Sequence, residues 1–146
     1  MSQKLGGINP EMMKQLTAIN ESSVSLHDAA KRGDLQKMQE FLADGKDVNA
    51  KDFKGVTALG YAVGHDQLST VKVLIDAKAN INDVDSAGNS AVHFAAGYGR
   101  VKVLEHLLAR GANASKANQQ GQTPMAVAQQ NKQQQAVALL QRHGAK

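Results

Sequence analysis

The chain has 146 residues and a formal net charge of +4, and 42% of its residues are apolar, which suits one folded domain with a modest core. It contains no Cys or Trp and only 3% aromatic residues, which excludes disulfides, thiolate metal sites and a core built on aromatic side chains. No apolar run approaches the roughly 20 residues that span a bilayer, and the N-terminus lacks a secretory signal, so a cytoplasmic location is expected. The basic excess leaves nucleic acid, phospholipid or an acidic protein as candidate partners.

Residues 1–22 form an N-terminal segment outside the periodic pattern of the rest of the chain. Asn9 and Pro10 are suited to the start of a helix. Apolar residues at helical spacing then form a one-sided stripe, namely Met12, Met13, Leu16 and Ile19. We interpret this helix as a cap on the first periodic unit. The alternative is the tail of an upstream domain, rich in Met for partner binding.

From Val24 to the C-terminus the sequence repeats every 33 residues without insertion or deletion. Residues of one type recur at this step, as in Gly55, Gly88 and Gly121, in Thr57, Ser90 and Thr123, and in Leu26, Leu59, Val92 and Met125. This period, with the boxes at residues 90–96 and 123–128, resembles the ankyrin repeat. The resemblance implies an all-α solenoid of about four units over residues 23–146. Each unit would contribute a finger turn, a short helix, a tight connection, a second helix and a loop.

The residue types at the recurring positions fit this arrangement. The finger glycines are able to take a positive φ, and the Thr or Ser two residues later is suited to capping the first helix. Pro124 fits the first position of its helix. The second helices are expected to place apolar residues on one face, with Leu68, Val71, Leu74 and Ile75 in one unit and Val101, Leu104, Leu107 and Leu108 in the next. Left-handed caps are expected where those helices end, at Gly45, Gly111 and Gly144.

The last unit differs from the others on the face that no further repeat would cover. Gln134 and Gln141 stand there at positions that are apolar in the earlier units. We interpret these glutamines as a solubilising cap on the end of the solenoid.

The sequence contains no catalytic constellation, and we predict a protein that is not an enzyme and that uses no cofactor or metal. The histidines are His27, His65, His93, His106 and His143, and none of them pair at the i, i+4 spacing of a helical metal site. His27 and His93 both stand at the fourth place of the box. We expect their imidazoles to bond the backbone of an adjacent repeat.

Solenoids bind through an extended concave surface, here built from finger turns and first helices. We therefore predict a monomer that binds a protein partner on this surface. The residues expected to project there are Lys31, Arg32, Phe53, Lys54, Val56, His65, Ser86, Asn89, Tyr98, Gln119, Gln122 and Gln130. Phe53 has no role in a core if it stands on a solvent-facing finger, which favours an interaction role, although single exposed Phe residues are common.

The charge is unevenly distributed along the chain. Residues 1–83 carry 10 basic and 11 acidic groups, a net charge of −1, whereas residues 84–146 carry 7 and 2, a net charge of +5. The basic residues form no run and have no base-stacking aromatic neighbours, so nucleic acid is not an expected partner. Lipid phosphates, an acidic protein and a merely solvated basic surface remain as explanations.

Residues 92–100 and 123–131 also resemble the C-terminal repeat domain of plant and algal cytosolic ankyrin-repeat chaperones that target chloroplast outer-envelope proteins. The resemblance implies recognition of two envelope lipids. For phosphatidylglycerol it implies Tyr98 and Arg100, whose guanidinium fork suits a phosphate. For monogalactosyldiacylglycerol it implies His27, while the family's acidic position is occupied here by Ala50.

The leading hypothesis is therefore a lipid-binding domain of such a chaperone. It would recognise anionic and galactolipid headgroups and associate peripherally with an organelle membrane. The alternative is an ankyrin adaptor that binds proteins through its concave face.

Overall fold

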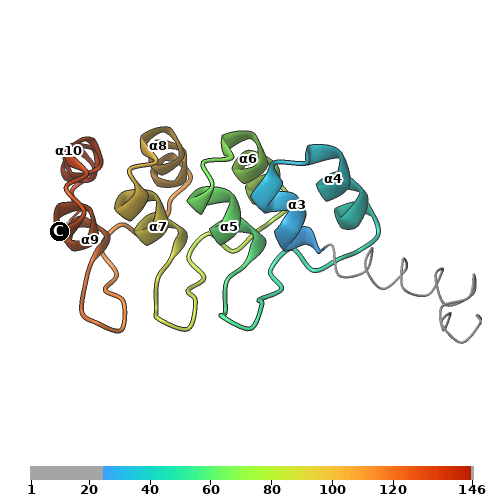
Figure 1. Cartoon of the computed structure of the whole chain (residues 1–146). Coiled ribbons are helices and arrows are strands. Elements are labelled where there is room, and N and C mark those ends of the chain that lie inside the picture. The colour runs from blue at the N-terminus through green and yellow to red at the C-terminus, as the bar shows by residue number, and fades with distance from the viewer. Residues whose placement is uncertain (1–24, 146) are drawn as a thin grey trace, which may run out of the picture.

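The computed structural model describes residues 25–145, which form four helical hairpins stacked side by side in one row (Figure 1). The helix predicted within residues 1–22 lies outside the described residues. Within residues 25–145 the only strand-like pairing is an isolated antiparallel bridge between Val84 and Ser90. The prediction of an all-α repeat solenoid is confirmed.

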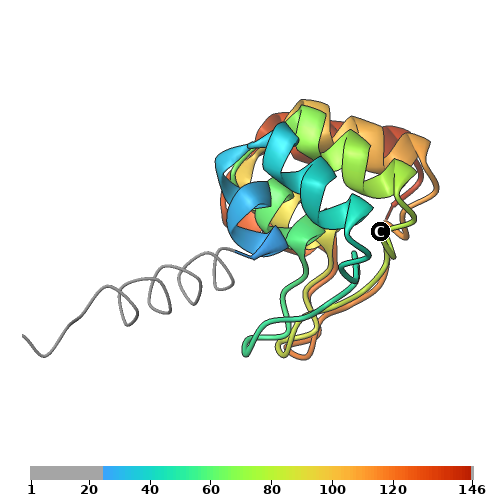
Figure 2. The same cartoon turned by 90° about the vertical axis from the view of Figure 1, so that its right-hand side faces the viewer.

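The helices form two layers. The first helices of the hairpins are α3 (Leu26–Arg32), α5 (Ala58–Gly64), α7 (Ala91–Tyr98) and α9 (Pro124–Gln130). The second helices are α4 (Leu35–Ala43), α6 (Leu68–Asp76), α8 (Val101–Ala109) and α10 (Gln134–Arg142). Each helix contacts its counterpart in the next repeat. The fingers, which are the loops at residues 51–56, 84–89 and 117–122, hang from one side of both layers (Figure 2).

The first helices begin at side-chain caps that the sequence predicts. Thr57, Ser90 and Thr123 each accept a hydrogen bond from the backbone N–H three residues later, and Ser25 does the same for α3. Pro124 occupies the first turn of α9 as expected. Each such cap stabilises a helix by about 1 kcal/mol, which matters for helices of two turns.

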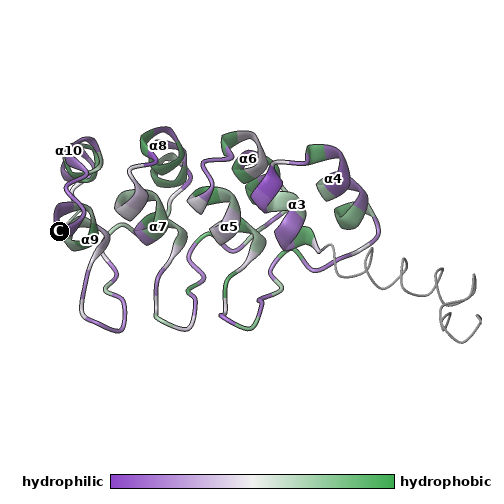
Figure 3. Ribbon diagram, in the orientation of Figure 1, coloured by the Kyte–Doolittle hydropathy of each residue, from purple (hydrophilic) through white to green (hydrophobic). Residues whose placement is uncertain are grey.

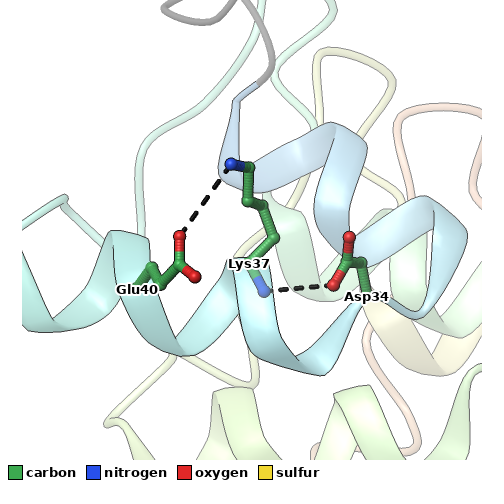
Figure 4. A network of polar contacts seen from close by, with 3 residues as sticks. All are labelled: Asp34, Lys37 and Glu40. Carbon is green, nitrogen blue, oxygen red and sulfur yellow. Dashed lines mark hydrogen bonds and ion pairs between the residues drawn. The ribbon is translucent and has the colours of Figure 1, made fainter.

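The second helix of the first repeat has a cap of its own. Asp34 Oδ1 accepts a hydrogen bond from the Lys37 backbone N–H at 3.1 Å, and the Lys37 ammonium lies 3.9 Å from Glu40 (Figure 4). In contrast, α6, α8 and α10 begin without a side-chain cap. Because the Lys37–Glu40 pair is exposed, it adds little stability, and the cap is the more important contact.

Glycine is required in the fingers for two reasons. Gly55 and Gly88 have φ values of 79° and 80°, in the left-handed region. A Cβ at Gly55 would lie 2.8 Å from the Ser86 backbone N, and one at Gly88 would lie 2.9 Å from the Gln119 backbone N. Adjacent fingers therefore approach one another through positions that tolerate no side chain.

The second repeat has other residues where its neighbours have left-handed glycines. Gly45, Gly111 and Gly144 follow the second helices with φ values of 83°, 87° and 76°, as predicted, but the same position holds Lys78 with a φ of 75°. Similarly, Asp66, with a φ of 59°, stands where the first repeat has Gly33. The second repeat therefore carries backbone strain at both of its helix ends.

The core lies between the two helical layers, where the ribbons are coloured as hydrophobic, whereas the fingers are mostly hydrophilic (Figure 3). It is built from Ala, Leu and Val, and its fully buried members include Leu59, Leu74, Val92 and Leu104. At the end of the row Gln134 and Gln141 are exposed, in agreement with the interpretation of a polar cap.

Candidate binding groove on the inner face

The inner face is the surface formed by the fingers and the first helices, and it contains a groove between the second and third repeats. The groove has a volume of about 460 Å³ and is open to solvent. Its lining residues come from α5, α7 and their fingers and are Lys54, Val56, Gly60, Tyr61, Gly64, His65, Asp85, Phe94, Tyr98 and Arg100. This volume falls within the range of about 300–1,000 Å³ that is typical of ligand-binding clefts.

The floor of the groove is formed by two glycines on α5. Gly60 and Gly64 are four residues apart and therefore lie on one face of the helix. A Cβ at Gly64 would lie 3.7 Å from the Tyr98 ring, whereas one at Gly60 would lie 2.8 Å from Val56 and 3.3 Å from the Phe94 ring. The register of the repeats places Lys31, Gly97 and Gln130 at the position of Gly64, and His27, His93 and Ala126 at the position of Gly60. The second repeat therefore differs from the others in having glycine at both positions of this helix face.

The walls of the groove are aromatic. Tyr98 is 58% exposed at the end of α7, and Phe94 lies half-buried one turn earlier. Tyr61 is fixed by a short hydrogen bond from its hydroxyl to the Asp52 carboxylate. The Lys31 ammonium lies 4.7 Å from the centre of the Tyr61 ring. Aromatic rings held in this way offer apolar contact area at a small cost in conformational entropy.

The Tyr61–Asp52 hydrogen bond shifts the pKa values of both side chains. It raises the pKa of Tyr61 to about 12, with a further contribution from burial. Partial burial by itself raises the pKa of the Asp52 carboxyl, but the hydrogen bonds from Tyr61, Val56 and Lys54 outweigh this effect, so the pKa lies below 3.8. Asp52 is therefore ionised and Tyr61 neutral at physiological pH, which keeps this wall of the groove in one state.

The rim of the groove is more basic than acidic. Arg100 donates hydrogen bonds from Nε and Nη2 to the Gly64 carbonyl at 3.3 and 3.0 Å, and its guanidinium lies 5.7 Å from the centre of the Tyr98 ring. Lys54 stands on the finger beside Phe53. Asp85 is the acidic lining residue, and its Oδ1 accepts backbone N–H groups of its own finger at 2.9 Å. The rim therefore carries two cations, Arg100 and Lys54, and one carboxylate, Asp85, which is hydrogen-bonded to its own finger.

His27 and His93 fasten adjacent repeats, as the sequence predicts. His27 Nε2 lies 2.9 Å from the Ala50 carbonyl and 3.0 Å from the Val56 carbonyl, so it donates to both. His93 Nε2 donates to the Gln122 carbonyl at 3.0 Å, and its Nδ1 accepts the Ser90 backbone N–H at 3.1 Å. Burial lowers the pKa of His93, consistent with a neutral ring.

Four of the residues predicted for the concave surface line the groove, namely Lys54, Val56, His65 and Tyr98. Arg100, which the resemblance assigned with Tyr98 to a lipid phosphate, lines it as well. Lys31 lies next to it over Tyr61. Asn89 and Tyr98 line a second hollow of about 210 Å³ toward the fourth repeat, which also shares Phe94. The remaining predicted residues lie away from the groove on finger tips or helix ends, namely Arg32, Phe53, Ser86, Gln119, Gln122 and Gln130. Phe53 is 90% exposed at its finger tip, as predicted.

The sequence interpretation missed Gly60, Tyr61, Asp85 and Phe94, which also line the groove. A usable signal for one of them was present in the register. Gly60 stands at the fourth place of the box, where the first and third repeats have histidine. The loss of that side chain marks the repeat in which the inner face is hollowed.

Some kinds of site are not found in the described part of the chain. Residues 25–145 contain no group of three or more His, Asp or Glu side chains placed to hold a metal ion. No helix in the same range has the length and hydropathy needed to cross a bilayer.

Comparison with known proteins agrees with the stacked hairpins. The family model for ankyrin repeats (3 copies) matches residues 26–118 and residues 79–146. The chain therefore belongs to the ankyrin-repeat family. It is also similar to the ankyrin repeat protein YahD of Escherichia coli (strain K12), with 43% identity over 53 residues. This match covers 36% of the present chain and only 26% of the length of that relative.

Proposed function

We propose that this chain is a protein-binding module whose groove receives a segment of a partner protein. The observation that carries the proposal is the groove itself, in which three aromatic side chains surround a floor of two glycines. Aromatic side chains that a bound partner shields from water are a usual source of binding energy in protein interfaces. The exposed rings of Tyr98 and Phe53 add apolar surface that the core does not use.

Affinity capture with the full chain tests this proposal. We expect partners bound by the wild type to be lost with Tyr98→Ala, which removes a wall of the groove, and with Gly64→Gln, which fills its floor. Lys102→Gln is the control, because Lys102 is exposed on α8 and does not line the groove. Partners that remain bound to both groove variants would contradict the proposal.

The lipid function implied by the chaperone resemblance has weaker support. Arg100 donates two N–H groups to the Gly64 carbonyl, and its remaining N–H groups suit a carboxylate as well as a phosphate, so this residue does not favour the lipid function. His27 uses Nε2 for two backbone carbonyls, and Ala50 offers no carboxylate to a sugar. We therefore place a protein partner first.

Vesicle flotation separates the two functions. Under the protein-binding proposal, vesicles with and without phosphatidylglycerol retain the chain equally poorly. Retention that requires phosphatidylglycerol and is lost with Arg100→Gln would instead favour the lipid function.

A further inference from the structure

We infer that the groove binds an extended peptide segment in which a large apolar side chain is followed two residues later by a carboxylate. This inference rests on the proposed protein-binding function and specifies the chemistry of the partner. The apolar side chain lies against Val56 and Phe94 at the level of Gly60, and the carboxylate pairs with Arg100 beside Gly64.

The apolar half of this motif follows from the glycine floor. At Gly60 the side chains of Val56 and Phe94 pack directly on the helix, since a Cβ there would lie 2.8 Å from Val56 and 3.3 Å from the Phe94 ring, whereas Gly64 leaves room beside the Tyr98 ring. Val56 and Tyr61 complete this apolar lining. A large aliphatic or aromatic side chain placed here contacts Val56 and the rings of Phe94 and Tyr98 at once, which is the arrangement of an interface anchor.

The acidic half follows from the charges at the rim. Among residues 25–145 the ion pairs are Lys37–Glu40 and Arg110–Asp76, so neither Lys54 nor Arg100 has a carboxylate within 4 Å. Asp85 is held by the N–H groups of its finger. The lining therefore has two cations, Lys54 and Arg100, and one carboxylate, Asp85, so an acidic side chain finds more opposite charge there than a basic one does.

Arg100 is a better anchor for the carboxylate than Lys54. Its guanidinium is held against the Gly64 carbonyl and lies beside the Tyr98 ring, so little side-chain entropy remains to be lost on binding. Lys54 stands on a finger, and its ammonium lies 5.6 Å from the ring of the exposed Phe53. We therefore assign the main contact to Arg100 and a smaller, screened contribution to Lys54.

The spacing of the motif comes from the helix beneath it. Four residues along a helix correspond to about 6 Å, which separates the levels of Gly60 and Gly64 on α5. In an extended peptide, residues i and i+2 point to the same side and are about 6.6 Å apart. An apolar residue at i, held against Val56 and Phe94 at the level of Gly60, therefore places residue i+2 at the level of Gly64, where Arg100 is bound.

A random dodecapeptide library displayed on phage tests the inference, with the full chain as bait. We expect enriched peptides to share an apolar residue followed at i+2 by Asp or Glu. Synthetic copies of these peptides, measured by fluorescence anisotropy, should bind Arg100→Gln at least about 5-fold more weakly and Gly64→Gln at least about 10-fold more weakly. Binding should also weaken from 50 to 500 mM NaCl, because the ion pair is partly exposed.

The repeats supply variants that preserve the fold. Gln67 stands at the position of Arg100 one repeat earlier and donates from Nε2 to the Lys31 carbonyl, so Arg100→Gln keeps an equivalent backbone contact without the charge. Gln130 occupies the position of Gly64 in the fourth repeat. Lys102→Gln changes the net charge by the same amount outside the groove and should leave peptide affinity within about 2-fold of the wild type.

The outcomes separate this inference from the proposed function. Enriched peptides that bind in the groove, as shown by loss with Gly64→Gln, but that lack an acidic residue or ignore Arg100→Gln overturn the inference and leave the function standing. Peptides unaffected by Gly64→Gln overturn both. If no peptide is enriched, the short-motif inference is wrong, and the capture experiment decides the function independently.

Discussion

The second and third repeats follow the same 33-residue pattern but differ at the positions that hold a repeat together. In the third repeat Ser90 and His93 form a reciprocal capping box, and His93 also reaches the next finger. In the second repeat Gly60 stands at the position of His93, and without a side chain it makes neither of these contacts. A void of about 10 Å³, lined in part by Gly60, Asp85 and Asn89, is left between α5 and the next finger.

The second repeat also carries left-handed backbone at Asp66 and Lys78, where the third has glycine. The second repeat therefore has fewer side-chain contacts to the next repeat and more backbone strain than the third. It also provides the floor of the groove. Binding surfaces are commonly drawn from the less stable parts of a fold. The groove therefore lies where the second repeat has Gly60 in place of the histidine that fastens the first and third repeats.

The largest effect is expected from breaking the fastening of the third repeat. His93→Ala removes a buried ring, one half of a capping box and the bond to Gln122, so the free energy of unfolding should fall by about 3 kcal/mol. Urea denaturation followed by circular dichroism measures this loss. His27→Ala, at a half-buried ring that bonds two carbonyls, should cost about half as much. Equal and small losses at both sites would show that the imidazoles are not what fastens the repeats.

The repeat architecture could be predicted because its signals are local or strictly periodic. Caps, finger glycines and the bonding role of His27 and His93 each depend on a residue and its register, and the structure confirms them. The groove depends instead on how side chains from adjacent repeats meet across the stack. The register placed Tyr98 on the inner face, but only the packed structure shows that it stands opposite Gly64.

The sequence interpretation of Arg100 was incomplete for a related reason. Its fork was assigned to a phosphate because of its place in a short turn motif. In the structure the same side chain caps the end of α5 in the preceding repeat, 36 residues away, through the Gly64 carbonyl. Such a contact depends on the separation of two helices, which sequence spacing alone does not specify.

Relieving the strain of the second repeat should have an intermediate effect. Lys78→Gly replaces a side chain at a φ of 75° and should raise the free energy of unfolding by about 0.5–1 kcal/mol. The matched change in the third repeat is Gly111→Ala, at a φ of 87°, which should lower it by about 1 kcal/mol. Both are measured by chemical denaturation. Changes of the same sign at the two sites would mean that backbone conformation is not what distinguishes these positions.

A smaller effect is expected from filling the groove floor. Gly64→Ala adds a Cβ at an ordinary contact distance of 3.7 Å from Tyr98 and improves helix propensity, so it should stabilise the fold by about 0.5 kcal/mol. The same variant should weaken partner binding, because it narrows the groove. Gly97→Ala in the third repeat should destabilise instead, since its Cβ would lie 2.8 Å from Val127. If Gly64→Ala binds partners as tightly as the wild type, the floor does not form part of the binding surface.

The smallest effect is expected from His106 on the second helix α8, through the pH dependence of the free energy of unfolding. His106 Nε2 is buried without a hydrogen-bond partner in the described part of the chain. Desolvation lowers the pKa of His106, assisted by the nearby charges of Lys72 and Arg110. As the pH drops below 6.5, the usual pKa of histidine, His106 takes up a proton in the unfolded chain but not in the folded chain. The free energy of unfolding therefore decreases as the pH is lowered, until the pH reaches the lower pKa of His106 in the folded chain.

His106→Val tests the contribution of His106 to this pH dependence. Valine is the natural replacement because the second repeat has Val73 at the same position. We expect the variant to be at least as stable as the wild type at pH 7.5 and to lose less stability between pH 7 and 5, as measured by urea denaturation at each pH. Some dependence should remain from His93, whose pKa is also lowered by burial. Asp52 contributes nothing in this window, because its carboxyl titrates below 3.8. An unchanged pH profile in His106→Val would show that His106 does not contribute to the acid sensitivity of the fold.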